Sequence, residues 1–217
     1  MIARLTFTAA LALASVVQAQ TPDKDRAAAT ATATATAYAE QLIADGEATA
    51  HFENITNDAT ARVRHRASGM TCAFTPGVRG STIRVFPSIG GATVPGDDVA
   101  CGFERGSTIL TTYATRYESR PSAEEVFQSA IGAIRRNSPD ARPRQGLQIT
   151  VPGPHETPPL IAAFDLDLGR GPALSLVMVS HIGDWSFKAR ATGPAGDPSV
   201  APTAAAAFAE SLPARAD

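Results

Sequence analysis

Three consecutive strand patterns near the C-terminus constrain the fold more than any other feature of the sequence. They are Leu160–Leu168, Ala173–Ile182 and Trp185–Thr192. The link Gly183-Asp184 has the length and composition of a two-residue hairpin turn. Strands joined by such short turns pair antiparallel, so we expect a meander here. Leu174–Val179 is almost continuously apolar, which predicts a central strand covered on both faces.

Further strand patterns precede the meander, and glycine or proline turns separate them. They cover Ala61–Ala67, Met70–Phe74, Ser81–Phe86, Val99–Glu104 and Ser107–Thr115. Strand patterns outnumber helix patterns, and most connections have the length of hairpin turns. This favours an α+β fold with a largely antiparallel β-sheet of about seven strands, covered by a few helices.

Helix patterns are fewer. The strongest covers Ser122–Arg136, where Ser122 and Glu125 have the spacing of a capping box. Apolar side chains recur within it at intervals of three and four residues, which is typical of a helix with one buried face. We also expect a short helix over Tyr38–Ala44 and a final helix that begins at Pro202.

The first residues have the pattern of a cleaved secretory signal. A basic start at Arg4 precedes a short apolar run, and small residues lead to an expected cut after Ala19. The run has roughly 13 residues, whereas a membrane span needs about 20. We expect a signal peptide over 1–19, a disordered Ala/Thr spacer or fraying helix over 20–37, and one α+β domain over 38–217. The mature chain would be periplasmic or secreted, without a transmembrane segment.

The two cysteines, Cys72 and Cys101, each lie in a strand pattern. Alternation places each thiol on the same strand face as two large apolar side chains. Cysteines of an exported protein are expected to be oxidised, so we predict a structural disulfide inside the core. The alternative is a redox-active pair, although such thiols usually lie close together in sequence at the start of a helix.

Motifs of catalytic and cofactor-binding families are absent from the sequence. It lacks the Gly-x-Ser-x-Gly, His-Glu-x-x-His, Walker and dinucleotide-binding patterns. None of the four histidines pairs with another at metal-ligand spacing. We therefore predict no cofactor and no metal. The formal net charge of −2 argues against nucleic-acid binding, because proteins that bind nucleic acids are usually basic.

Two histidines lie in strand patterns with valine neighbours, which is typical of buried or half-buried positions. These are His65 and His181. A serine-histidine-acid site assembled from distant residues, with Ser68 or Ser180 as nucleophile, stays open because such triads are defined by geometry.

One pair of carboxylates has a spacing that acid–base chemistry could use. Asp165 and Asp167 share a strand face, and residues two apart on a strand lie roughly 6.5–7 Å apart. That separation falls within the range found in glycosidases. The face opposite Phe164 and Leu166 is also the face that a half-exposed strand turns to water, so we interpret the pair as solvated surface.

The most distinctive polar pattern is a row of arginines. Arg62, Arg64 and Arg66 alternate, so an extended backbone places all three on one face. Guanidinium groups in a row suit phosphate or carboxylate partners, such as an anionic component of the cell envelope. A second basic group lies at and just past the end of the predicted helix: Arg135, Arg136, Arg142 and Arg144. The alternative is an arginine-rich surface paired with the chain's own acids.

A resemblance to exported proteins adds to this interpretation. The run 183–192, followed by an alanine-rich terminal helix, resembles the tail of a group of uncharacterised exported bacterial proteins. The order of strand-rich half, amphipathic helix, three-stranded meander and helix also resembles the PsbP-type α/β/α sandwich. The resemblance covers the C-terminal part of the chain. It implies a fold and a binding or accessory role, and it carries over no catalytic residue.

The sequence thus favours a non-enzymatic, exported accessory or binding module. Its alternative is a hydrolase whose site is assembled from distant serine, histidine and acidic residues. A pocket that holds His65 or His181 against a serine and an acid would favour the hydrolase. A flat sheet face above a packed interior would favour the binding module.

Overall fold

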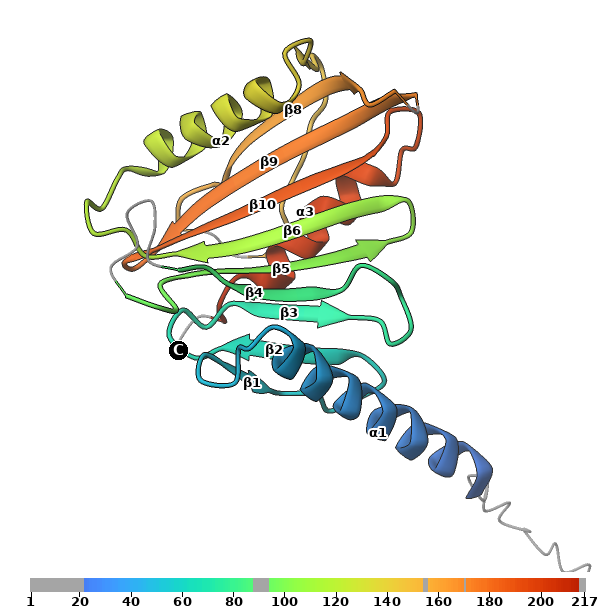
Figure 1. The fold of residues 1–217 in the computed structure, drawn as a ribbon. Coiled ribbons are helices and arrows are strands. Elements are labelled where there is room, and N and C mark those ends of the chain that lie inside the picture. Colours follow the sequence, from blue (N-terminus) through green and yellow to red (C-terminus); the bar gives the residue numbers. More distant parts are fainter. Residues whose placement is uncertain (1–21, 88–93, 154–155, 170, 215–217) are drawn as a thin grey trace, which may run out of the picture.

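The computed structural model describes residues 22–87, 94–153, 156–169 and 171–214. Within them the chain forms three helices and two antiparallel sheets, which confirms the predicted α+β class (Figure 1). The small sheet consists, in spatial order, of β1 (Phe52–Asn54), β2 (Ala61–His65) and β3 (Thr71–Phe74). The large sheet consists, in spatial order, of β4 (Thr82–Val85), β5 (Asp98–Arg105), β6 (Thr108–Thr115), β10 (Trp185–Pro194), β9 (Pro172–Ile182), β8 (Leu160–Asp167) and β7 (Arg142–Pro143).

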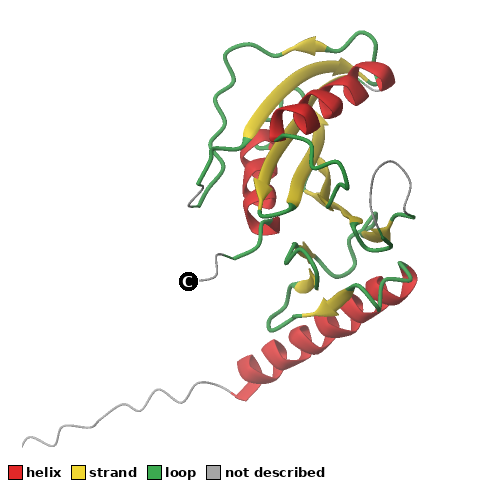
Figure 2. Cartoon of the chain, turned by 90° about the vertical axis from the view of Figure 1, so that its left-hand side faces the viewer, coloured by secondary structure: helices red, strands yellow, loops and turns green. Residues whose placement is uncertain are grey.

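The helices pack in three different places. α1 (Pro22–Asp45) lies against the small sheet and contacts β4. α2 (Ala123–Asn137) and α3 (Val200–Ser211) lie on opposite faces of the large sheet (Figures 1 and 2). Across the described parts of the chain, no helix combines the length and apolar character that a membrane span requires.

α1 begins further toward the N-terminus than the short helix expected over Tyr38–Ala44. Residues 22–37, expected to be a disordered spacer or a fraying helix, form the first part of this helix. Its alanines favour helix, and its threonines donate their hydroxyls to carbonyl oxygens four residues earlier. From Ala35 onward one face of the helix is buried in the core, through Ala35, Ala39, Leu42 and Ile43. Residues 1–21, which contain the predicted signal peptide, lie outside the described part.

The C-terminal meander is confirmed. β8, β9 and β10 pair antiparallel in sequence order, and β9 is buried from Ala173 to Ser180. Gly183 and Asp184 connect β9 to β10, and the φ of 57° at Gly183 is a conformation that suits glycine. β10 also pairs with β6. The predicted central strand therefore lies inside a sheet that continues on both sides.

The predicted disulfide is also confirmed. Cys72 on β3 is bonded to Cys101 on β5, with a Cα–Cα distance of 6.3 Å. The two strands belong to different sheets, so the bridge joins the sheets across the core. Beside it, the rings of Phe74 and Phe103 meet edge to face at 5.9 Å. The bridge thus links two sheets that share one hydrophobic core.

α2 begins with the predicted capping box. The Ser122 hydroxyl accepts a hydrogen bond from the Glu125 backbone N–H, and the Glu125 carboxylate accepts one from the Ser122 backbone N–H. Its apolar stripe packs on β8 and β9 and forms a second core cluster with Phe164 and Val177. On this side of the sheet the helix covers one half, and β4, β5, β6 and β10 lie beside it without a helix over them (Figure 1).

Candidate functional site

The uncovered half of the large sheet is a polar surface, which we call the open face. It is built by alternate side chains of four strands that point away from α3. They are Thr82, Arg84 and Phe86 on or next to β4; Asp98, Ala100, Gly102 and Glu104 on β5; Ile109, Thr111, Tyr113 and Thr115 on β6; and Ser186, Lys188, Arg190 and Thr192 on β10. Because the four strands are paired in register, these side chains form a regular grid.

The open face is hollowed over β4, β5 and β6. The hollow has a volume of about 290 Å³ and reaches the small residues Ala100 and Gly102. A Cβ atom added to Gly102 would lie 2.7 Å from the Thr82 hydroxyl oxygen, so a larger residue could not be placed there without a shift. Small side chains in the middle of the grid therefore create the depth of the hollow.

Aromatic side chains line one end of the hollow. The rings of Phe86 and Tyr113 are stacked, with 6.5 Å between centroids and an interplanar angle of 18°. The Lys188 ammonium nitrogen lies 4.3 Å from the centre of the Tyr113 ring, which is cation–π geometry. Burial lowers the pKa of Lys188, with a further lowering from Arg190, while Asp98 opposes the shift. Lys188 is therefore a cation that has lost part of its hydration.

The open face carries two arginines, Arg84 on β4 and Arg190 on β10. Among the described residues, no carboxylate lies within ion-pair distance of Arg84 or Arg190. The acids of the face lie at opposite corners, with Asp98 at one end of β5 and Glu104 near the other. Burial raises the pKa of Asp98, whose carboxylate accepts a hydrogen bond of 2.8 Å from the Thr115 hydroxyl. The face therefore carries its cations on β4 and β10, and Glu104 lines the hollow together with Arg84.

The arginine row predicted from the sequence has a different environment. Arg62 forms an ion pair of 2.6 Å with Asp58, and Arg64 and Arg66 bind the two carboxylate oxygens of Glu53 at 2.6 and 2.9 Å. These acids lie on β1 and in the loop between β1 and β2. The arrangement is the one expected of an arginine-rich surface paired with its own carboxylates, so we place the candidate site elsewhere.

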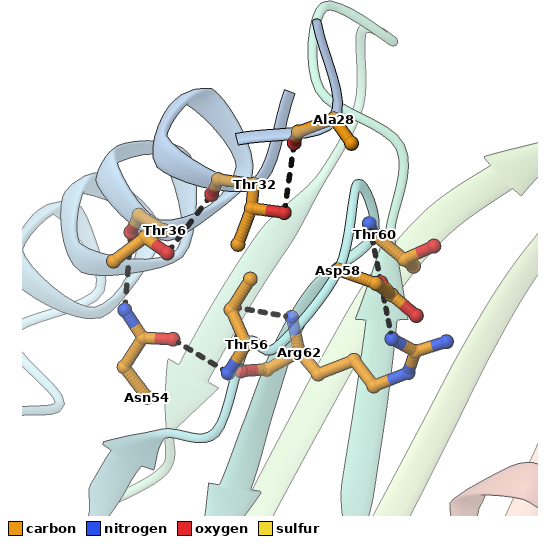
Figure 3. A network of polar contacts seen from close by, with 8 residues as sticks. All are labelled: Ala28, Thr32, Thr36, Asn54, Thr56, Asp58, Thr60 and Arg62. Atoms are coloured by element: carbon orange, nitrogen blue, oxygen red, sulfur yellow. Dashed lines mark hydrogen bonds and ion pairs between the residues drawn. The ribbon is translucent and has the colours of Figure 1, made fainter. Parts of the chain in front are cut away.

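Arg62 also belongs to a network that fastens α1 to the small sheet (Figure 3). The Arg62 backbone N–H donates to the Thr56 hydroxyl oxygen at 2.9 Å. The Thr56 N–H donates to the side chain of Asn54, whose amide in turn donates to the Thr36 carbonyl oxygen. This part of the arginine row therefore supports the fold.

Both strand histidines are hydrogen-bonded to serines. His65 Nδ1 lies 2.8 Å from the Ser68 hydroxyl oxygen, and both side chains are buried. His181 Nε2 lies 2.7 Å from the hydroxyl oxygen of Ser186, a residue that sequence reasoning did not single out as a nucleophile. Ser180 forms neither of these contacts.

The other candidate residues of the sequence analysis contact residues of the chain itself. Asp165 forms an ion pair of 2.5 Å with Arg144, so it is not a free acid–base group, and Asp167 accepts a hydrogen bond from the Gly169 N–H. Arg135 lies over the Phe164 ring at 5.9 Å. Across the ranges that the structure describes, no group of three or more histidine, cysteine, aspartate or glutamate side chains could hold a metal ion.

Comparison of the chain with models of protein families, with curated proteins and with solved structures found no match. The resemblance to exported bacterial proteins and to the PsbP-type sandwich therefore stays a prediction. The site has to be interpreted from its own geometry and charge.

Proposed function

We propose that this chain is an exported binding protein that holds an anionic ligand on the open face. The observation that carries the proposal is that Arg84, at the hollow, and Arg190, on β10 of the same face, have no carboxylate within ion-pair distance among the described residues. An unpaired guanidinium group offers a planar fork of donors that matches a carboxylate or a phosphate. Lys188, two residues before Arg190 on β10 and partly dehydrated, adds a third positive charge.

The shape of the open face suits a small ligand or the end of a chain. The hollow over β4, β5 and β6 has a volume of about 290 Å³, close to the lower limit of small-molecule sites, roughly 300 Å³. The stacked rings of Phe86 and Tyr113 offer apolar contact beside the cations. A carboxylate- or phosphate-bearing small molecule, or the terminal unit of an acidic envelope polymer, fits this combination.

Two observations support export. The bond between Cys72 and Cys101 is of the kind that forms and persists in oxidising compartments. The N-terminal pattern that ends at Ala19 is that of a secretory signal. We therefore place the mature protein in the periplasm or outside the cell, where its ligand would be an anionic component of the envelope or its surroundings.

The proposal is tested by removing two cations from each of two faces. Arg84→Gln with Arg190→Gln changes the open face, and Arg64→Gln with Arg66→Gln changes the arginine row by the same charge. Binding of inorganic phosphate and of polyglutamate is measured by calorimetry at two salt concentrations.

Hydrogen bonds to charged groups contribute about 1.5–3 kcal/mol each. The open-face variant should therefore bind at least tenfold more weakly, while the matched control keeps its affinity within about twofold because its arginines are already paired. Binding should also weaken with added salt. Equal losses in both variants, or a loss confined to the control, would show that the ligand is elsewhere.

A further inference from the structure

A row of polar side chains crosses four strands at one end of the open face. In register order the row is Asp98 on β5, Thr115 on β6, Ser186 on β10 and His181 on β9. Two hydrogen bonds divide it into pairs. The Thr115 hydroxyl donates to Asp98 at 2.8 Å, and the Ser186 hydroxyl oxygen lies 2.7 Å from His181 Nε2.

The serine–histidine pair lines a cavity of its own, with a volume of about 120 Å³. Ser186 and His181 share this cavity with Tyr117 and Arg120, which lie in the segment between β6 and α2. Ser186 is buried and His181 is half-buried. The cavity therefore has room for a small group next to the serine hydroxyl.

The protonation states at this cavity suit proton transfer from serine to histidine. Burial lowers the pKa of His181, so its imidazole is neutral at pH 7. With the ring hydrogen on Nδ1, Nε2 accepts the Ser186 proton. The charged groups that face the cavity are Arg120 and Asp184, which lie 3.5 Å apart. Burial raises the pKa of Tyr117, so its phenol keeps its proton and can donate.

The second serine–histidine pair of the chain lies in the interior. His65 and Ser68 are buried beside the rings of Phe52 and Trp185. The Ser68 hydroxyl also accepts the Met70 backbone N–H at 3.1 Å, which fixes a turn. This pair serves the fold, and it provides an internal control for the first.

We propose that Ser186 is a nucleophile activated by His181, and that it takes the acyl group of small carboxylic esters. The Ser186 oxygen forms a bond to the ester carbonyl carbon while His181 Nε2 accepts the hydroxyl proton. The bond from carbon to the alcohol oxygen then breaks, and the alcohol leaves with the proton from His181. Water hydrolyses the acyl-serine, giving its own proton to His181, and Ser186 is regenerated with release of the carboxylic acid.

Two neighbouring groups can meet the negative charge that develops on the carbonyl oxygen, and one of them, Arg120, also forms an exposed ion pair of 3.5 Å with Asp184. The Arg120 guanidinium and the Tyr117 phenol line the same cavity as the nucleophile. A cation and a neutral hydroxyl donor are both groups that stabilise an oxyanion. The cavity volume limits the acyl group to a short one.

A serine-directed fluorophosphonate tests the nucleophile in the intact, oxidised protein. Attack by Ser186 would break the phosphorus–fluorine bond and leave a phosphonyl group on the serine, which peptide mass spectrometry locates. We expect one adduct, on Ser186, and hydrolysis of p-nitrophenyl acetate above the rate of the buffer. Ser186→Ala should abolish both, and His181→Gln should lower the labelling rate at least tenfold while the serine stays in place.

The control variant is Ser68→Ala, which removes the hydroxyl of the interior pair and should leave labelling of Ser186 unchanged. In the unaltered chain, the rate at which Ser186 is labelled should decrease as the pH is lowered. The decrease should occur below the ordinary histidine pKa of about 6.5, where His181 becomes protonated. Circular dichroism checks that each variant is folded. An adduct on other residues only, no adduct at all, or a labelling rate that His181→Gln does not change would overturn the proposal. None of these outcomes depends on anion binding by Arg84 and Arg190.

Discussion

His65 should make the folded protein sensitive to mild acid. The side chain is 1% exposed, and its ring lies 5.1 Å from Phe52 and 5.4 Å from Trp185. Burial, with a smaller contribution from His51, lowers its pKa from 6.5 to about 4, although Asp97 acts in the opposite direction. Protonation of this imidazole is therefore easier in the unfolded chain than in the folded one.

The sign of the effect follows from that difference. Between pH 6.5 and pH 4 the unfolded chain binds more protons at His65 than the folded chain does, so stability falls as the pH falls. Each unit of pKa difference corresponds to about 1.4 kcal/mol. With a folded pKa of about 4, the free energy of unfolding should be lower at pH 4 than at pH 6.5 by up to about 3 kcal/mol. That is a large part of a typical domain stability of about 5–15 kcal/mol.

Urea unfolding between pH 7 and pH 4.5 measures this loss. The single tryptophan, Trp185, is buried next to His65, so its fluorescence reports the transition. His65→Gln removes the titrating group and keeps an acceptor for Ser68. The variant should be less stable than the unaltered chain at pH 7. The difference between their free energies of unfolding should then decrease steadily below pH 6.5. Two curves that stay parallel over this range would refute the depressed pKa.

The disulfide and the N-terminus give two further predictions. Changing both Cys72 and Cys101 to serine should lower the free energy of unfolding by about 3–4 kcal/mol in the loop-entropy model, for a sequence separation of 29 residues. A variant with unchanged stability in calorimetry would show that the bridge is dispensable. Mass spectrometry of protein isolated from the periplasm should find Gln20 as the first residue, whereas an intact Met1 in the membrane fraction would contradict export.

The sequence was sufficient to predict an element where a local pattern of residues decides its structure. The meander over β8, β9 and β10 follows from apolar runs and short turns, and the capping box at Ser122 marks the start of α2. The disulfide was predictable because both cysteines alternate with large apolar side chains. The separation of their strands into two sheets was not, because alternation indicates a strand's inward face and not the element that packs on it.

The candidate site could not be predicted from the sequence, because it also depends on which strands and helices pack together. Arg84 and Arg190 share one face because β10 pairs with β6, a contact between segments far apart in the chain, and β5 and β6 lie between their strands. Alternation did indicate that Lys188 and Arg190 face away from the core, but it could not show that α2 stops short of them. The carboxylates that pair with the arginine row could not be identified from the sequence, because Glu53 lies on β1, a strand too short to be recognised, and that strand pairs Glu53 with Arg64.

The arginine side chains themselves provide the most direct test of anion binding on the open face. Nuclear magnetic resonance of the labelled protein resolves the Nε–Hε groups of Arg84, Arg190 and Arg64 during a titration with inorganic phosphate and then with polyglutamate. We predict that the signals of Arg84 and Arg190 shift together with one saturation curve, while the signal of Arg64, already bound to Glu53, stays in place. Shifts confined to Arg64 and its neighbours in the arginine row, or no shift of Arg84 and Arg190 at millimolar probe, would contradict the account.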